Sequence, residues 1–284
     1  MGERAAVRVY AGRLVDVLEV DVVIGGVPYL NAKPLVAWFD TPEGRASGIE
    51  VVYNVPSRLA RMVERGEVAC ALVSSVELFR HPDWKAVPRV AIASTGEVLS
   101  VRLFSKVPLS RVRSVALDTS SLTSAALVRI LFARWWEADP QYLSAAPDLQ
   151  AMLQRADAAL LIGDRGMFAP AEGLYVADLG EEWYRWTGLP FVWALWLGRA
   201  EQMTATLVEV LQHAQAWGRE HLEQIVSHEA QRMGKEEGLV RRYLCKVMQY
   251  EMTPEHEAGL ARFAEECHRL GLAPSPALAG TASK

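Results

Sequence analysis

Amide and hydroxyl side chains occur where the predicted strands of this sequence give way to helices. Residues 22–35 contain an apolar β-branched run, two glycines, the elbow Tyr29-Leu30-Asn31, and then Pro34 in the first turn of a helix. Asn31 is thereby delivered to the carboxyl end of a strand, which is where α/β folds bind ligands. An amide at this point can hydrogen-bond a ligand or cap the helix, and the spacing alone favours the cap.

Two further helix starts carry hydroxyl groups. Ser74 and Ser75 follow one apolar strand, and Ser121, Thr123 and Ser124 follow another. Free backbone N–H groups at a helix N-terminus, with hydroxyl groups beside them, suit a carboxylate or a phosphate. One such site would be ordinary helix capping. Three of them, spread over two lobes, favour a small anionic ligand.

Ser100 and two aspartates are further candidates. Ser100 lies in an expected strand over residues 98–104, so its hydroxyl faces either a cleft or the core, depending on the parity of the strand. Asp118 and Asp164 each end a predicted strand, where a carboxylate commonly orders the following turn or caps a helix. Asp164 could instead contact a ligand.

Residue patterns for cofactors and metals are missing from the sequence. It has no GxGxxG or Walker loop, no GxSxG elbow, and no acid and base at a convincing spacing, so no nucleotide cofactor is expected. The three cysteines form no CxxC pair, and the six histidines show no HExxH spacing. We therefore expect no disulfide, no metal and no other cofactor.

Charge and hydropathy argue against two classes of partner. A net charge of −4 provides no basic field for nucleic acid. No apolar run is long enough to span a bilayer, and the first twenty residues carry charges every few positions instead of the apolar core of a signal peptide. A soluble cytoplasmic protein that binds neither nucleic acid nor membranes is expected.

The order of the predicted elements indicates two α/β lobes. Strand, helix and strand alternate from residue 22 to about residue 107, and a second such cycle follows. Long apolar runs at 98–104 and 191–197 bracket the second cycle, so we expect paired crossover strands that join an inserted lobe to the first lobe. The predicted lobe 1 comprises residues 1–104 and 191–284, and lobe 2 comprises residues 105–190.

The last third of the chain is predicted to be helical. Apolar residues recur at spacings of three and four between residues 203 and 217, and the segments 220–233, 236–248 and 254–270 behave alike. These helices are expected to pack on the first lobe. Residues 273–284 are rich in Pro, Ser, Ala and Gly, which predicts a disordered tail.

Taken together in chain order, several segments resemble one enzyme family. They are VPYLNAKPL, STGEVLSVRLFSKVPL, DTSSLTSAAL, LLIGD and DLGEEWYRWTGLPFVWALW, of which the YLN elbow and TGLPF are the most specific. These segments are similar to those of chorismate dehydratases of the futalosine route to menaquinone. The resemblance covers residues 22–197. It implies a two-lobed periplasmic-binding-protein type II fold that dehydrates chorismate to 3-[(1-carboxyvinyl)oxy]benzoate without a metal or an organic cofactor.

The resemblance also implies roles for individual residues. Asn31 and Ser100 match the active-site residues of the family by their position in the motifs. The expected substrate-binding residues are Tyr29, Ser74, Ser75, Ser121, Thr123, Ser124 and Asp164. Chorismate carries two carboxylates, which need donors from both lobes. Because an amide has no useful basicity near neutrality, we expect the enolpyruvyl carboxylate of the substrate to take the proton while Asn31 and Ser100 hold the geometry.

Three other functions are compatible with the same fold class. A solute-binding protein would share the fold, but the sequence shows no export signal. The later enzyme that processes a cyclic futalosine derivative begins with a different polar motif from the YLN elbow. A ligand-sensing regulator would need a DNA-binding segment, and no helix-turn-helix pattern precedes the first predicted strand.

Overall fold

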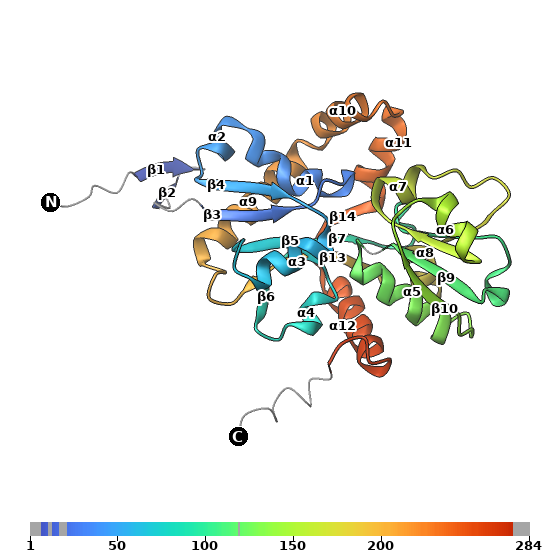
Figure 1. The fold of residues 1–284 in the computed structure, drawn as a ribbon. Coiled ribbons are helices and arrows are strands. Elements are labelled where there is room, and N and C mark those ends of the chain that lie inside the picture. Colours follow the sequence, from blue (N-terminus) through green and yellow to red (C-terminus); the bar gives the residue numbers. More distant parts are fainter. Residues whose placement is uncertain (1–6, 11–12, 17–21, 119, 275–284) are drawn as a thin grey trace, which may run out of the picture.

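Two large β-sheets, each flanked by helices, organise the computed structural model, which describes residues 7–10, 13–16, 22–118 and 120–274 (Figure 1). A separate antiparallel pair, β1 (Val7–Tyr10) and β2 (Arg13–Asp16), precedes them. Among the described residues, no helix combines the length and the apolar character that crossing a membrane requires.

The first sheet has seven strands in the order β14-β7-β13-β5-β3-β4, with β6 paired to β13. Its strands are β3 (Val22–Gly26), β4 (Ile49–Tyr53), β5 (Cys70–Ser74), β6 (Trp84–Ala86), β7 (Val90–Ser94), β13 (Phe191–Arg199) and β14 (Met248–Glu251). Strand β3 runs parallel to β4 and β5, whereas β13 runs antiparallel to β5 and β7. Every residue of β5 and β7 is buried, as expected of strands that are covered on both faces.

Short helices follow the strands of this sheet, and longer helices return to it from the C-terminal third. The first group is η1 (Leu30–Ala32), α1 (Lys33–Val36), η2 (Ala37–Asp40), α2 (Pro42–Arg45), α3 (Pro56–Glu64) and α4 (Glu77–Arg80). The second group is α9 (Ala205–Glu220), α10 (Leu222–Met233), α11 (Glu237–Arg242), the π-helical turn η4 (Tyr243–Val247) and α12 (Pro254–Arg269).

The second sheet has five strands in the order β10-β9-β11-β8-β12. They are β8 (Arg102–Ser105), β9 (Ser114–Asp118), β10 (Gln141–Ala145), β11 (Ala158–Leu161) and β12 (Tyr175–Asp178). The helical segments around it are η3 (Leu109–Arg111), α5 (Leu122–Arg134), α6 (Leu149–Arg155), α7 (Gly163–Phe168) and α8 (Leu179–Thr187). Because β8 belongs to this sheet, the sheet begins at Arg102, inside the segment expected for lobe 1.

The first connection between the sheets differs from the prediction. The expected strand over 98–104 is wrong in its first half, because a strand starts only at Arg102. Leu99 has a φ of 63°, and a hydrogen bond of 2.7 Å from the Ser100 N–H to the Val98 carbonyl closes a tight turn around it. An extended backbone is excluded there, so strand parity does not decide the direction of Ser100. The expected pairing of two crossover strands is also wrong, since β13 pairs with β5, β6 and β7 of the first sheet.

The C-terminal third is helical except at one strand. The predicted helices at 203–217, 220–233 and 254–270 are confirmed by α9, α10 and α12. The segment predicted as a helix at 236–248 instead ends in a π turn and leads into β14, which pairs with the edge of β7. Met248 and Tyr250 are the buried residues of β14 and alternate with less buried neighbours, so pairing and burial on one face override the helical spacing. Of the expected tail, Ala273 is buried, and residues 275–284 lie outside the described residues.

A shared core joins the two sheets. Trp183 of α8 lies edge-on to Phe191 of β13 with ring centroids 5.2 Å apart, and Phe191 lies 4.9 Å from Phe263 of α12. Helix α12 contacts both β13 and α5, and α9 contacts α1. Packing of α5, α8 and α12 with β13 therefore joins the two lobes.

Candidate active site

A cavity lies between the two sheets and is walled by residues from both lobes. Its volume is about 50 Å³, below the roughly 300–1,000 Å³ that is usual for small-ligand sites. Its apolar wall includes Ile92, Ile162 and Trp193. Its polar wall consists of residues that the sequence had marked: Tyr29, Asn31, Ser74, Ser100, Ser121 and Ser124.

The elbow after β3 presents Asn31 to this cavity. The chain leaves β3 at Gly26 and turns through η1, and the N-cap position of α1 is Ala32. Asn31 makes no capping hydrogen bond, so the capping interpretation that spacing favoured is wrong. Its Oδ1 atom is buried and has no hydrogen-bond partner among the described residues. A buried carbonyl oxygen without a partner is costly, which makes this atom available to a ligand that carries a donor.

Ser100 is held from a part of the chain that sequence reasoning had not connected with it. The hydroxyl of Tyr243, the first residue of η4, donates a hydrogen bond of 2.7 Å to Ser100 Oγ. Both side chains are almost fully buried. Burial strongly raises the pKa of Tyr243, which keeps its hydroxyl protonated, and the Asn31 amide is among the groups that oppose this rise. The sequence places Tyr243 in an apolar helical pattern, where a tyrosine gives no signal of a polar role.

The N-terminus of α5 brings hydroxyl groups to the opposite wall. Ser121 caps the helix, since its Oγ accepts from the Ser124 N–H at 3.2 Å and donates to Ser124 Oγ at 2.9 Å. Ser74 of the first lobe accepts from the Leu122 N–H at 3.3 Å. The positive end of a helix of 13 residues thus faces the cavity with hydroxyl groups around it, an arrangement that favours an anion.

Ser75 and Thr123 do not line the cavity. Their hydroxyl oxygens lie 3.3 Å apart, and Ser75 donates to the Val192 carbonyl at 2.7 Å. Thr123 Oγ1 also accepts from the Val76 N–H at 3.2 Å. Both side chains are buried, and their hydrogen bonds fasten the first lobe to the start of α5.

Asp164 also lies outside the cavity wall, in the first turn of α7 and not at the end of a strand. Its Oδ1 accepts from the Leu30 N–H at 3.1 Å, which ties the second lobe to the elbow beside Asn31. Burial raises the pKa of its carboxyl, and the hydrogen bond from Leu30 opposes this effect. The neighbouring Gly163 has a φ of 58°, and a Cβ there would lie 3.0 Å from the ring of Tyr29. Glycine is therefore the residue that fits this contact between the elbow and the second lobe without backbone strain or a steric clash.

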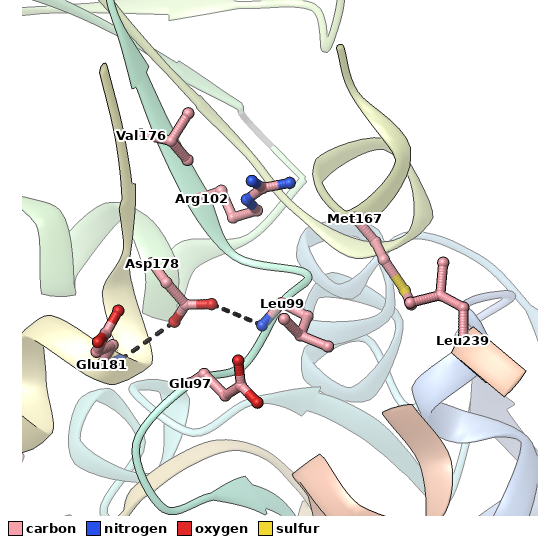
Figure 2. A pocket seen from close by; sticks show the side chains of 8 residues that line it. All are labelled: Glu97, Leu99, Arg102, Met167, Val176, Asp178, Glu181 and Leu239. Atoms are coloured by element: carbon pink, nitrogen blue, oxygen red, sulfur yellow. Dashed lines mark hydrogen bonds between the residues drawn. The ribbon is translucent and has the colours of Figure 1, made fainter. Parts of the chain in front are cut away.

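Asp178, which the sequence analysis did not single out, joins the two chain segments that connect the lobes. One carboxylate oxygen accepts from the N–H groups of Gly180 and Glu181 and so caps α8. The other accepts from the Leu99 N–H at 2.7 Å, and both lie within 3.1 Å of the Val98 nitrogen. Figure 2 shows this carboxylate between Leu99 and Glu181, beside a second hollow. Burial raises the pKa of Asp178, and the four backbone N–H groups oppose it.

The cavity is poor in ionisable groups. Among the described residues that line it, Tyr29 alone has a titratable side chain, and burial raises its pKa. No cluster of three or more His, Cys, Asp or Glu that could hold a metal occurs within the described parts of the chain. The site offers neutral donors and acceptors, an apolar wall and a helix N-terminus, which can orient a ligand and stabilise charge.

Sequence comparison relates the chain to proteins of known role. A family model described as menaquinone biosynthesis matches residues 22–269. The chain is also 34% identical over 273 residues to the chorismate dehydratase of Thermus thermophilus, and this match covers 89% of the chain and 97% of that protein.

Comparison of structures bears on the fold. A crystal structure of a protein from Archaeoglobus fulgidus is similar with a TM-score of 0.72 and 18% identity, over 88% of this chain and 98% of that one. The periplasmic aliphatic sulphonate binding protein of Escherichia coli is similar with a TM-score of 0.60 and 18% identity, over 89% and 88% of the two chains. At this identity the likeness shows the fold alone. The predicted two-lobed, periplasmic-binding-protein-like fold is confirmed.

Proposed function

The chain belongs to the menaquinone-biosynthesis family, and on this premise we propose that it is a chorismate dehydratase that forms 3-[(1-carboxyvinyl)oxy]benzoate in the futalosine route. The observation that carries the proposal is the neutral cavity between the lobes, in which amide and hydroxyl groups converge on a space without a basic side chain. The 34% identity to a curated chorismate dehydratase supports it. We propose, in addition, that the enzyme acts in the cytoplasm.

The reaction removes one proton and one hydroxyl group as water. The product requires loss of hydrogen from the ring carbon that bears the enolpyruvyl ether and loss of hydroxyl from its neighbour, after which the ring is aromatic. Aromatisation makes the elimination strongly downhill, so the protein needs mainly to orient the substrate and to stabilise developing charge. The proton passes to the enolpyruvyl carboxylate of the substrate and then completes the water that leaves.

The two carboxylates of chorismate have different roles in this proposal. The ring carboxylate lies at the N-terminus of α5, where Ser121 and Ser124 add hydroxyl groups to the helix dipole. The enolpyruvyl carboxylate stays free to accept the proton. Asn31 and Ser100 hold the region of the leaving hydroxyl, and Tyr29 closes the cavity against Gly163. Ser74, Ser75, Thr123 and Asp164 contribute by fixing the wall and the elbow.

Purified protein incubated with chorismate tests the proposal directly. Ring aromatisation is followed by ultraviolet absorbance, and the product is identified by mass. We expect turnover by the wild type and losses of about 100-fold or more in kcat for Asn31→Ala and Ser100→Ala, the scale seen when one preorganised hydrogen-bond group is removed. The matched control is Ser110→Ala, because Ser110 is exposed and lies outside the cavity wall.

Two outcomes would contradict the proposal. Binding of chorismate without any product would favour a solute-binding role for the same fold. Near-normal turnover by both cavity variants would refute the assignment of Asn31 and Ser100, even if the wild type were active.

A further inference from the structure

Resting on the proposed function, we infer that Tyr243 is a positioning residue that turns Ser100 into a hydrogen-bond donor aimed at the leaving hydroxyl of the substrate. Tyr243 lies outside the cavity wall and acts through Ser100. Neither the sequence motifs nor the comparisons with known proteins assign it a role.

The fold brings Tyr243 to this place from the far end of the chain. It opens the π-helical turn η4, which contacts the elbow helix η1 and the strand β14. Single π turns inside helices are rare and occur frequently at functional sites. The side chain is 1% exposed, and its hydroxyl reaches Ser100 across a separation of 143 residues. A polar atom buried this deeply needs its partner, and Ser100 provides it.

The direction of this hydrogen bond decides what Ser100 can do. A serine hydroxyl has one proton and two lone pairs. Because Tyr243 donates to Ser100 Oγ, one lone pair is occupied and the serine proton is left to donate elsewhere. No acceptor for it is found among the described residues, and Ser100 forms part of the cavity wall. The serine proton is thus available to a ligand oxygen in the cavity.

Asn31 supplies the complementary group. Its Oδ1 is a buried acceptor without a partner among the described residues, and it lines the same cavity. A hydroxyl group both accepts and donates, so it satisfies Ser100 and Asn31 together. The resulting chain runs from Tyr243 to Ser100, to the substrate hydroxyl, and to Asn31. Each bond in such a chain polarises the next, which strengthens the donation from Ser100 as negative charge builds on the departing oxygen.

The chemistry of the step balances without a proton from the protein. The carbon–oxygen bond breaks with its electron pair on the leaving oxygen, and the proton taken from the ring carbon by the substrate carboxylate completes the water. Ser100 and Tyr243 keep their protons and only stabilise the charge.

The test compares four variants: Tyr243→Phe, Ser100→Ala, the double variant, and Tyr250→Phe as the matched control. Tyr250 is also a buried tyrosine in the neighbouring strand β14, but its hydroxyl has no hydrogen-bond partner among the described residues. For each variant, kcat and KM for chorismate, binding by the change in intrinsic tryptophan fluorescence, to which the cavity residue Trp193 contributes, and the melting temperature are measured.

We expect Tyr243→Phe to lower kcat by about 10-fold to 100-fold, with KM changed less than about threefold and the melting temperature close to that of Tyr250→Phe. In the Ser100→Ala background, the same change should cost no further activity, because the group through which Tyr243 acts is gone. Tyr250→Phe should turn over chorismate like the wild type.

Several results would overturn the inference while leaving the proposed function standing. The first is a wild-type kcat in Tyr243→Phe. The second is a double variant in which the losses of the two single variants multiply. The third is a loss of activity in Tyr243→Phe that accompanies a fall in melting temperature that Tyr250→Phe does not show. If the wild type binds chorismate without converting it, the proposed function fails, and the inference about the leaving hydroxyl fails with it. A wild type that neither binds nor converts chorismate overturns both.

Discussion

Replacing Asp178 by Asn removes a clamp that holds the turn before Ser100. The carboxylate accepts from N–H groups on both segments that connect the lobes, and its contact to Leu99 is short, at 2.7 Å. An Asn can keep one oxygen on the cap of α8, but its amide NH₂ then faces the N–H groups of Val98 and Leu99, donor against donor. The substitution preserves shape and changes only charge and hydrogen bonding.

The structure gives the size of the effect. A hydrogen bond to a charged group contributes about 1.5–3 kcal/mol, and the short bond to Leu99 is of this kind. Release of the left-handed Leu99, whose φ is 63°, returns about 1 kcal/mol of strain. The net loss is then about 0.5–2 kcal/mol, which corresponds to a fall in melting temperature of roughly 1–8 °C. Because the relaxed turn carries Ser100 with it, kcat should fall by about 10-fold or more.

Calorimetry and the chorismate assay measure the two effects on the same samples. Asp148→Asn is the matched control, because Asp148 caps α6 through a single surface hydrogen bond to the Ala151 N–H, where Asn performs about as well as Asp. A melting temperature and kcat of wild-type size in Asp178→Asn would refute the reasoning. Equal losses in both variants would refute it as well, because they would show a general cost of losing an aspartate cap.

Two further predictions concern stability. Gly218→Ala should destabilise the fold by about 3 kcal/mol in denaturant unfolding, because its Cβ would collide with the Pro34 carbonyl oxygen where α9 crosses α1. Gly238→Ala is the control, because the nearest neighbour of its Cβ is a flexible side chain at 3.4 Å, and it should instead stabilise the fold by about 0.5–1 kcal/mol. Equal effects of the two substitutions would contradict this prediction. Burial lowers the pKa of His256 below its ordinary 6.5, and its neutral Nδ1 accepts from the Thr253 N–H in the capping box of α12. The unfolded chain therefore binds this proton more readily, so stability is complete above about pH 6.5 and falls below it. His256→Gln, which keeps a capping side chain, should flatten the change in melting temperature between roughly pH 5 and pH 8, and an unchanged slope would contradict the assignment.

Much of the fold could be predicted because short stretches of sequence specify it. The apolar runs that form β5 and β9, and the proline and glycine around α3, lie within a few residues of the features they specify. Prediction failed where neighbours in space competed with local spacing. The turn at Leu99 replaced part of a strand because Asp178 binds its backbone, and β14 replaced the end of a helix because β7 offered an unpaired edge.

The candidate site divides in the same way. The sequence indicated six polar groups that the structure places around one cavity. Five of them stand at the junction of a strand and a helix, and Ser100 lies in the turn between β7 and β8. Ser75 and Thr123 stand at the same junctions, but their hydroxyl groups face each other and not the cavity. Their sequence neighbours Ser74 and Ser124 line the cavity instead. Local sequence does not determine which hydroxyl of a pair meets its partner across the lobes.

The sequence by itself determined an α/β chain with an amide elbow and hydroxyl-bearing helix starts, since strand and helix preferences act over a few residues. Only the tertiary structure decided that Tyr243 donates to Ser100 and that Asp178 binds the backbone of Leu99, contacts that join residues 143 and 79 positions apart. Such contacts depend on how two sheets are brought together by a shared apolar core, and no local pattern encodes that arrangement.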